Sequence, residues 1–262
     1  MVALVLAVGA AVAVVADWRG ADVGAEVLTA EEMASRPALG SVSAAPVTPT
    51  PSTSASTSPP SVLRLTGPVP SRGRGDFGYD DRTGPVLGET GTLRRYRVAV
   101  EDGSGEDAGE FATAVGKALA GPGSWVDGGL RLQQVGADAR HDFTVYLATP
   151  ATAGRMCAVG GVDIRVGGRP YTSCRAPGKV IINLERWRLS VPHYVSGRVP
   201  LSVYRTYVVN HEVGHQLGHR HERCPGKGRP APVMMQQTLF LNGCVANPWP
   251  YRDGRRYAGP PL

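Results

Sequence analysis

Apolar and polar residues alternate along much of the chain in patterns that predict strands and helices. Residues 93–100 alternate as in a half-buried strand, and Phe111, Val115 and Leu119 recur at helical spacing within residues 107–120, before a Gly-Pro-Gly stop signal. Residues 201–217 form the longest helical stretch. Further strands are predicted at residues 130–135, 141–148, 161–166 and 179–183. This order, which ends in an irregular tail rich in Pro and Gly, predicts an α+β domain whose strands pack against two main helices.

The N-terminal quarter of the chain has a different pattern. Residues 1–16 are apolar and uncharged, and a helix of this length spans about 24 Å, short of the ~30 Å hydrocarbon core, so a secretory signal or a membrane anchor is expected. Residues 17–72 are predicted to be a disordered spacer, because the stretch after residue 37 is rich in Pro, Ser and Thr and has few large apolar residues. The folded domain is therefore expected at residues 73–262.

The net positive charge of the chain belongs to this domain. The chain carries 28 Lys and Arg against 22 Asp and Glu, or +6. Residues 1–72 hold four basic and five acidic residues, which leaves 24 minus 17, or +7, for the remainder. No Lys/Arg cluster of the kind found in nucleic-acid-binding proteins is present, so we expect no nucleic-acid partner. The protein is expected to be a monomer.

The four cysteines fall into two local pairs. An even count in an exported chain suggests disulfides, and the local pairing joins Cys157 with Cys174 and Cys224 with Cys244. A Cys-ligated zinc site would need CxxC-like spacing, which is absent. Local disulfides are therefore preferred among the three possible connectivities.

Histidine has the most informative distribution, because four of the six fall within eleven residues. The stretch from His211 to His221 contains HExxHxxGxxH. On a helix, His211 and His215 project from one face and can bind one zinc ion, while Glu212 projects beside them, where it can act as general base on water activated by the metal. Gly218 permits the positive φ that lets the chain turn back after the helix.

His221 is then expected to supply the third zinc ligand. Three histidines leave a fourth coordination position open, which is typical of a catalytic zinc site. His219 lies in the same turn and competes for this role, but the spacing from Gly218 favours His221. The chain is thus predicted to bind one catalytic Zn²⁺.

This extended motif resembles that of the metzincin zinc endopeptidases. The resemblance implies a metzincin-like zincin fold, with a mixed twisted sheet, an active-site helix and an irregular C-terminal subdomain. It also implies a Met-containing turn beneath the zinc, for which Met234 is preferred over Met235. The Cys224–Cys244 loop would enclose this turn. In metzincins an edge strand before the active-site helix pairs with the extended substrate, so one of the strands between residues 142 and 183 is expected to do so here.

A finer resemblance points to an actinobacterial family of secreted domains of unknown function. It rests on Asn210-His-Glu-Val-Gly-His, Cys224-Pro-Gly, Ala231-Pro-Val-Met and the segment from Gly243-Cys244 to Asn247-Pro-Trp-Pro. One departure from some metzincins is Gln236, which stands where a Tyr follows the Met turn. The donor that stabilises the oxyanion is therefore open among Tyr194, Tyr204 and Gln236.

These observations predict a secreted or cell-surface zinc-dependent endopeptidase that hydrolyses extended peptide or protein substrates. Residues 1–16 would either direct its export or anchor it in the cytoplasmic membrane. Two alternatives stay open. One is a non-catalytic, zinc-containing binding module of the cell envelope, suggested by the basic domain and the spacer. The other is an amide hydrolase with the same chemistry that acts on the cross-peptides of the cell wall.

Overall fold

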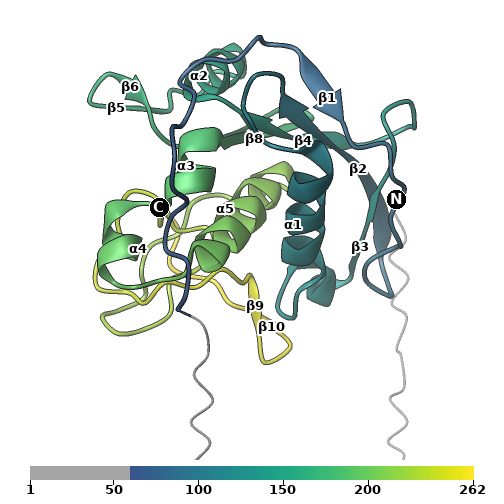
Figure 1. Cartoon of the computed structure of the whole chain (residues 1–262). Helices are drawn as coiled ribbons and strands as arrows, with labels where there is room; N and C mark the ends of the chain where they lie inside the picture. The colour runs from purple at the N-terminus through teal and green to yellow at the C-terminus, as the bar shows by residue number, and fades with distance from the viewer. Residues whose placement is uncertain (1–59) are drawn as a thin grey trace, which may run out of the picture. The chain divides into compact units, whose positions relative to one another are not determined.

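The computed structural model describes residues 60–262 (Figure 1). The predicted signal or anchor at residues 1–16 and most of the predicted spacer lie outside this part of the chain. Among the described residues, no helix has the length and hydropathy needed to cross a membrane.

A mixed six-stranded sheet forms the centre of the fold. Strand β2 is paired in parallel with β3 and β4, β4 with β8 also in parallel, and the sheet ends at the antiparallel strand β7. Strand β1 pairs antiparallel with the end of β2. The strands are β1 (Phe77–Tyr79), β2 (Thr92–Glu101), β3 (Leu130–Gln134), β4 (Phe143–Ala148), β7 (Cys174–Ala176) and β8 (Lys179–Asn183).

Both faces of the inner strands are buried. In β8, Val180 and Ile182 join the main core while Ile181 packs in a second cluster on the opposite face. Strand β4 alternates in the same way, with Leu147 in the main core and Tyr146 in the second cluster. Strands covered on both faces form nearly continuous apolar runs, which explains why both strands are mostly apolar.

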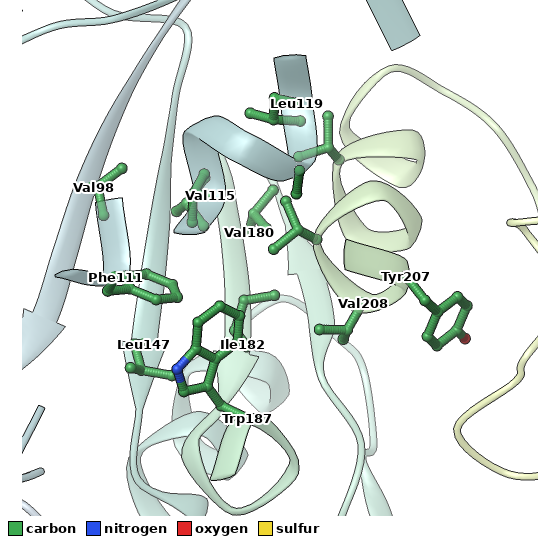
Figure 2. Close-up of a cluster of buried hydrophobic side chains, with 14 of the residues drawn as sticks. Val98, Phe111, Val115, Leu119, Leu147, Val180, Ile182, Trp187, Tyr207 and Val208 are labelled. Carbon is green, nitrogen blue, oxygen red and sulfur yellow. The ribbon is translucent and has the colours of Figure 1, made fainter. Parts of the chain in front are cut away.

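Helices α1 and α5 cover one face of the sheet and pack against each other (Figure 1). Figure 2 shows Phe111 and Val115 of α1, Val208 of α5 and the indole of Trp187 in one cluster with the strand residues. Asp107 caps α1, because its side chain accepts a hydrogen bond from the Glu110 amide. The helices are α1 (Ala108–Ala120), α2 (Pro150–Val159), α3 (Leu184–Leu189), α4 (Pro192–Ser196), α5 (Leu201–Gln216) and the 3₁₀ turn η1 (Trp125–Gly128).

The predicted strand at residues 161–166 is mostly wrong. Only its last two residues are extended, as strand β5 (Arg165–Val166), which forms a small exposed hairpin with β6 (Arg169–Pro170). The pattern also missed α2, which buries only Thr152, Ala153 and Cys157, too narrow a face to produce a clear apolar period. The two main helices are thus accompanied by three shorter ones in a mixed α/β arrangement.

The domain boundary at residue 73 is too late. The amide of Leu65 donates to the carbonyl of Arg188, and the Leu201 amide at the start of α5 donates to the carbonyl of Val62. The Ala151 amide likewise donates to the carbonyl of Ser71. We call residues 60–72 the strap, since their backbone is held against α2, α3 and α5 although their composition resembles that of a spacer.

The C-terminal segment after α5 is irregular and contains only a short hairpin, β9 (Tyr251–Arg252) and β10 (Arg255–Arg256). A disulfide joins Cys224 to Cys244 within it, and a second joins Cys157 of α2 to Cys174 of β7. Both pairings are the local ones expected from the sequence.

Candidate metal centre

Helix α5 presents two imidazoles from adjacent turns, and a third meets them from the segment beyond the helix. The Nε2 atom of His215 lies 3.2 Å from Nε2 of His211 and 3.1 Å from Nε2 of His221. One ligand atom from each of the three side chains falls within 4.8 Å of the others, an arrangement able to hold a metal ion. The i, i+4 spacing along the helix accounts for the first two positions.

Backbone carbonyl groups orient two of these rings. The carbonyl oxygen of Val233 lies 2.8 Å from Nδ1 of His211, and that of His219 lies 2.8 Å from Nδ1 of His215. A carbonyl can only accept, so each Nδ1 carries the proton and each Nε2 presents a lone pair. Two lone pairs that face each other at 3.2 Å cannot hydrogen-bond, whereas a cation between them satisfies both.

The electrostatic environment keeps the imidazoles neutral. Burial lowers the pKa of His211 well below its usual value, and the adjacent His215 lowers it further. Burial also lowers the pKa of His215, and it lowers that of His221 to about 4. Neutral imidazole is the form that binds metals, so the donor set fits a divalent cation.

The turn after α5 decides which histidine completes the cluster. Gly218 has φ +98°, a left-handed conformation that turns the chain out of the helix. The ring of His219 points away from the cluster and stacks on Trp125, with ring centroids 4.5 Å apart. His221 therefore joins the cluster, while His219 contributes its carbonyl oxygen.

Glu212 lies beside the histidines and is almost fully buried. Burial raises the pKa of its carboxyl to about 8, because desolvation disfavours the charged form. Its side chain lines the same cavity as the three imidazoles. A carboxyl with this pKa is suited to accept a proton and release it again near neutral pH.

A turn at residues 233–235 packs beneath the helix, and it distinguishes the two methionines. A Cβ added at Gly214 would lie 2.4 Å from Sδ of Met234 and 2.6 Å from Cζ2 of Trp125. Met234 thus touches α5 between the turns that carry His211 and His215. Met235 packs in a separate cluster with Ala231 and Cys244.

Three buried tyrosines hold the segment after this turn. Tyr207 donates to the carbonyl of Met235, Tyr194 donates to Oε1 of Gln237, and the hydroxyl groups of Tyr204 and Thr238 are 3.0 Å apart. Tyr194 and Tyr204 do not line the cavity, so neither is placed as an oxyanion donor, whereas Gln236 does line it.

The support of the site also includes residues that the sequence did not single out. The indole N–H of Trp125 donates to the carbonyl of Asn210, which immediately precedes His211. The Gln237 amide donates to the carbonyls of Pro232 and Asn247. A single Trp or Gln does not belong to a motif of regular spacing, so the sequence alone does not reveal its role. Only the fold brings Trp125 and Gln237 to the site.

The cluster opens into a cavity of about 470 Å³ bordered by the edge strand β7. Thr172, Ser173, Cys174 and Arg175 form one wall. Since β7 pairs only with β8 in this sheet, one of its edges is free to pair with another extended segment. Of the strands in the region 142–183, the one that borders the cavity is therefore β7, a three-residue strand that the sequence pattern did not reveal.

Comparison with known proteins identifies the family. A family model described as "Protein of unknown function (DUF3152)" matches residues 63–252. The chain belongs to the DUF3152 family. The match begins inside the strap and extends to the end of β9, so the strap is part of the DUF3152 domain. No curated protein and no solved structure matches the chain.

Proposed function

We propose that this DUF3152 protein is a secreted or cell-surface zinc-dependent endopeptidase of metzincin-like design. The observation that carries the proposal is the convergence of three neutral imidazoles on one point, with a buried carboxyl beside them, at an open cavity. A structural metal site is usually closed by four protein ligands, whereas three ligands at a cavity leave room for a substrate.

Zinc is the metal that a set of three histidines suits best. When held there, it supplies Lewis acidity that polarises a carbonyl group and activates water. His211, His215 and His221 would bind it through Nε2, and the carbonyls of Val233 and His219 would keep the first two rings in the required tautomer.

Glu212 would move the proton during hydrolysis. Its carboxylate accepts a proton from the attacking water, and the resulting acid, kept stable by burial, delivers that proton to the departing amine. Gln236 remains the candidate donor to the oxyanion, since it alone of the three residues considered from the sequence lines the cavity.

The substrate would be an extended peptide. The unpaired edge of β7 beside the site offers backbone hydrogen bonds to such a chain. The disulfide between Cys174 and Cys157 of α2 would hold this strand in place while a peptide pairs with it. Two disulfides also favour an oxidising, extracytoplasmic location for the domain.

The decisive experiment replaces Glu212→Gln. We expect hydrolysis of an internally quenched peptide library to fall by about 10²–10⁴-fold while one zinc per chain is retained, because the amide cannot accept the proton. Glu110→Gln on the exposed surface of α1 is the matched control and should retain full activity. Undiminished hydrolysis by the zinc-loaded Glu212 variant would refute the mechanism.

Two other outcomes would support different functions. Zinc in the wild-type protein without cleavage of any peptide would favour the binding module, which salt-sensitive adsorption to wall polymer would then test. Release of cross-peptide fragments from purified peptidoglycan, with no cleavage of linear peptides, would favour the wall amide hydrolase.

A further inference from the structure

We infer that the cleft selects peptides with an acidic side chain near the scissile bond, which Arg175 and Arg220 bind. This inference rests on the proposed function and specifies its substrate class. It is carried by two cationic side chains that line the cavity without an acidic partner among residues 60–262.

The acidic groups of the cavity do not neutralise these arginines. Asp163 lines the cavity, but both of its carboxylate oxygens accept hydrogen bonds from Arg165, at 2.9 Å each. Hydrogen bonds from Arg165 accordingly hold the pKa of Asp163 at about 2. Glu212, the other acidic residue of the wall, is buried beside the imidazoles.

Arg175 is positioned by the fold. It lies in β7 between the disulfide-bonded Cys174 and the buried Ala176, and its Nε donates to Oε1 of Gln216 at 3.2 Å. This contact orients the guanidinium next to the metal site, where its charge contributes to the lowered pKa of His215. Only one of the five N–H donors is engaged within the described part of the chain, so the planar fork is available to a ligand.

Arg220 lines the cavity from the segment after α5. It stands between His219, whose ring is stacked on Trp125, and the ligand His221, so its backbone is fixed on both sides. Its side chain is exposed and makes no hydrogen bond with the described residues. It thus adds a second positive charge to the cavity near the third ligand.

A carboxylate is the substrate group that fits these two cations. Arginine binds carboxylates through two parallel hydrogen bonds, and a half-buried guanidinium gains more from such a pair than a fully solvated one. An extended peptide that pairs with β7 would pass directly over Arg175, which lies in that strand. Thr172 and Gln236 in the cavity are uncharged. The carboxylate of Asp163 is already paired with Arg165, so none of these three cavity residues selects for basic side chains.

The test compares matched peptides with the full, zinc-loaded protein. Internally quenched peptides that share one cleavable bond carry Glu, Gln or Lys at each of the three positions on either side. We expect at least one position at which Glu raises kcat/KM about tenfold over Gln and Lys lowers it, with an advantage that shrinks between 50 and 300 mM NaCl. Arg175→Gln should bring the Glu-to-Gln ratio close to one, and Arg220→Gln should reduce it by a smaller factor.

Arg229→Gln is the matched control, because Arg229 is exposed and lies outside the cavity. It should retain the wild-type ratio. Thermal unfolding of each variant shows whether it folds. If one arginine variant fails to fold, the variant at the other cavity arginine supplies the comparison, together with Arg175→Lys, which keeps the positive charge but lacks the planar guanidinium that binds a carboxylate through two hydrogen bonds.

Binding separates this inference from the proposed function. Fluorescence anisotropy with the zinc-loaded Glu212→Gln variant measures peptide affinity without turnover. Tighter binding of Glu than Gln peptides, abolished by adding Arg175→Gln, supports the inference even if no peptide is cleaved. Cleavage with equal rates for Glu and Gln at every position overturns the inference and leaves the endopeptidase standing. Absence of both cleavage and binding overturns both.

Discussion

At the scale of single residues, the site depends on the groups that aim the imidazoles as much as on the imidazoles themselves. His219 illustrates this, because its ring stacks on Trp125 while its carbonyl oxygen accepts from His215. We therefore expect its side chain to be dispensable for the proposed metal binding, although its backbone position is not. The same turn places His221 within reach of the cluster.

Substitution of these two histidines should have unequal effects. His221→Ala removes one of three ligands and should weaken zinc binding by at least 100-fold, whereas His219→Ala leaves all three ligand nitrogens and should weaken it less than about tenfold. Competition with a chromogenic chelator measures both affinities. Equal losses, or a larger loss for His219→Ala, would show that the ligand assignment is wrong.

The buried titratable groups predict how the metal-free protein responds to pH. Below pH 6.5 the unfolded chain protonates histidines whose folded pKa values are lowered, to about 4 for His221, so the site should lose stability as the pH falls from 6.5 toward 4. Glu212 has the opposite effect on the free energy of unfolding. Its pKa in the folded protein is about 8, so the folded state takes up a proton before the unfolded state does, and this uptake should stabilise the fold as the pH falls from 8 toward 4.5.

The contribution of this site to stability should therefore be greatest near pH 6.5. Urea unfolding of the metal-free protein across pH 5–8 measures it. Glu212→Gln should flatten the profile between pH 6.5 and 8 and steepen the loss of stability below pH 6.5, where the Glu212 contribution no longer offsets that of the histidines. A profile of Glu212→Gln that matches the wild type from pH 6.5 to 8 would contradict the assignment.

At the scale of elements, the site is the contact between α5 and the turn at residues 233–235. Gly214 allows Met234 and Trp125 to approach the helix closely, and the Val233 carbonyl from the same turn orients His211. The Cys224–Cys244 disulfide closes the segment that contains this turn, whereas the Cys157–Cys174 disulfide joins the edge strand β7, which borders the cavity, to α2. The two disulfides thus support different parts of the site.

Their removal should separate metal binding from substrate binding. Replacing Cys224 and Cys244 by Ser should lower the free energy of unfolding by about 3 kcal/mol on the loop-entropy model and weaken zinc affinity, because the turn loses its closure. Replacing Cys157 and Cys174 should retain zinc affinity but raise KM for peptides, since β7 loses its anchor. Chelator competition and peptide kinetics on both double variants test this, and a reversed pattern would contradict it.

At the scale of the whole molecule, the strap links parts of the domain that are distant in sequence. Its residues hydrogen-bond to α2, to α3 and to the first turn of the helix that carries the histidines. The composition of this segment favours an extended chain without its own core. Such a chain can still be ordered when its backbone groups find partners on a surface that is already folded.

Truncation should therefore be costly. A chain that begins at residue 73 loses four hydrogen bonds made by Val62, Leu65, Thr66 and Ser71, and its free energy of unfolding should fall by about 2–4 kcal/mol relative to a chain that begins at residue 60. Urea denaturation of both fragments gives the difference. Equal free energies of unfolding would contradict this prediction, because they would show that water replaces the hydrogen bonds of the strap at no cost in stability.

The sequence by itself determined the elements with strong periodicity and the residues of the histidine cluster. The helix predicted at residues 201–217 and the strand predicted at residues 179–183 correspond to α5 and β8 within a residue. The helix is long enough for its period to be clear, and the strand has a continuous apolar centre. The spacing of His211, His215 and His221 follows from the geometry of one helix and one turn, so it is visible without a fold.

Only the tertiary structure decided what surrounds that cluster. Short elements such as β7 and α2, the ordering of the strap, and the choice of Met234 over Met235 depend on contacts between residues far apart in the chain. Trp125 reaches the helix of the histidines from 85 residues away, and the sequence contains no local signal of that approach. Local spacing thus encodes which three histidines can meet, whereas the packing of distant segments determines how their rings are oriented and what surrounds them.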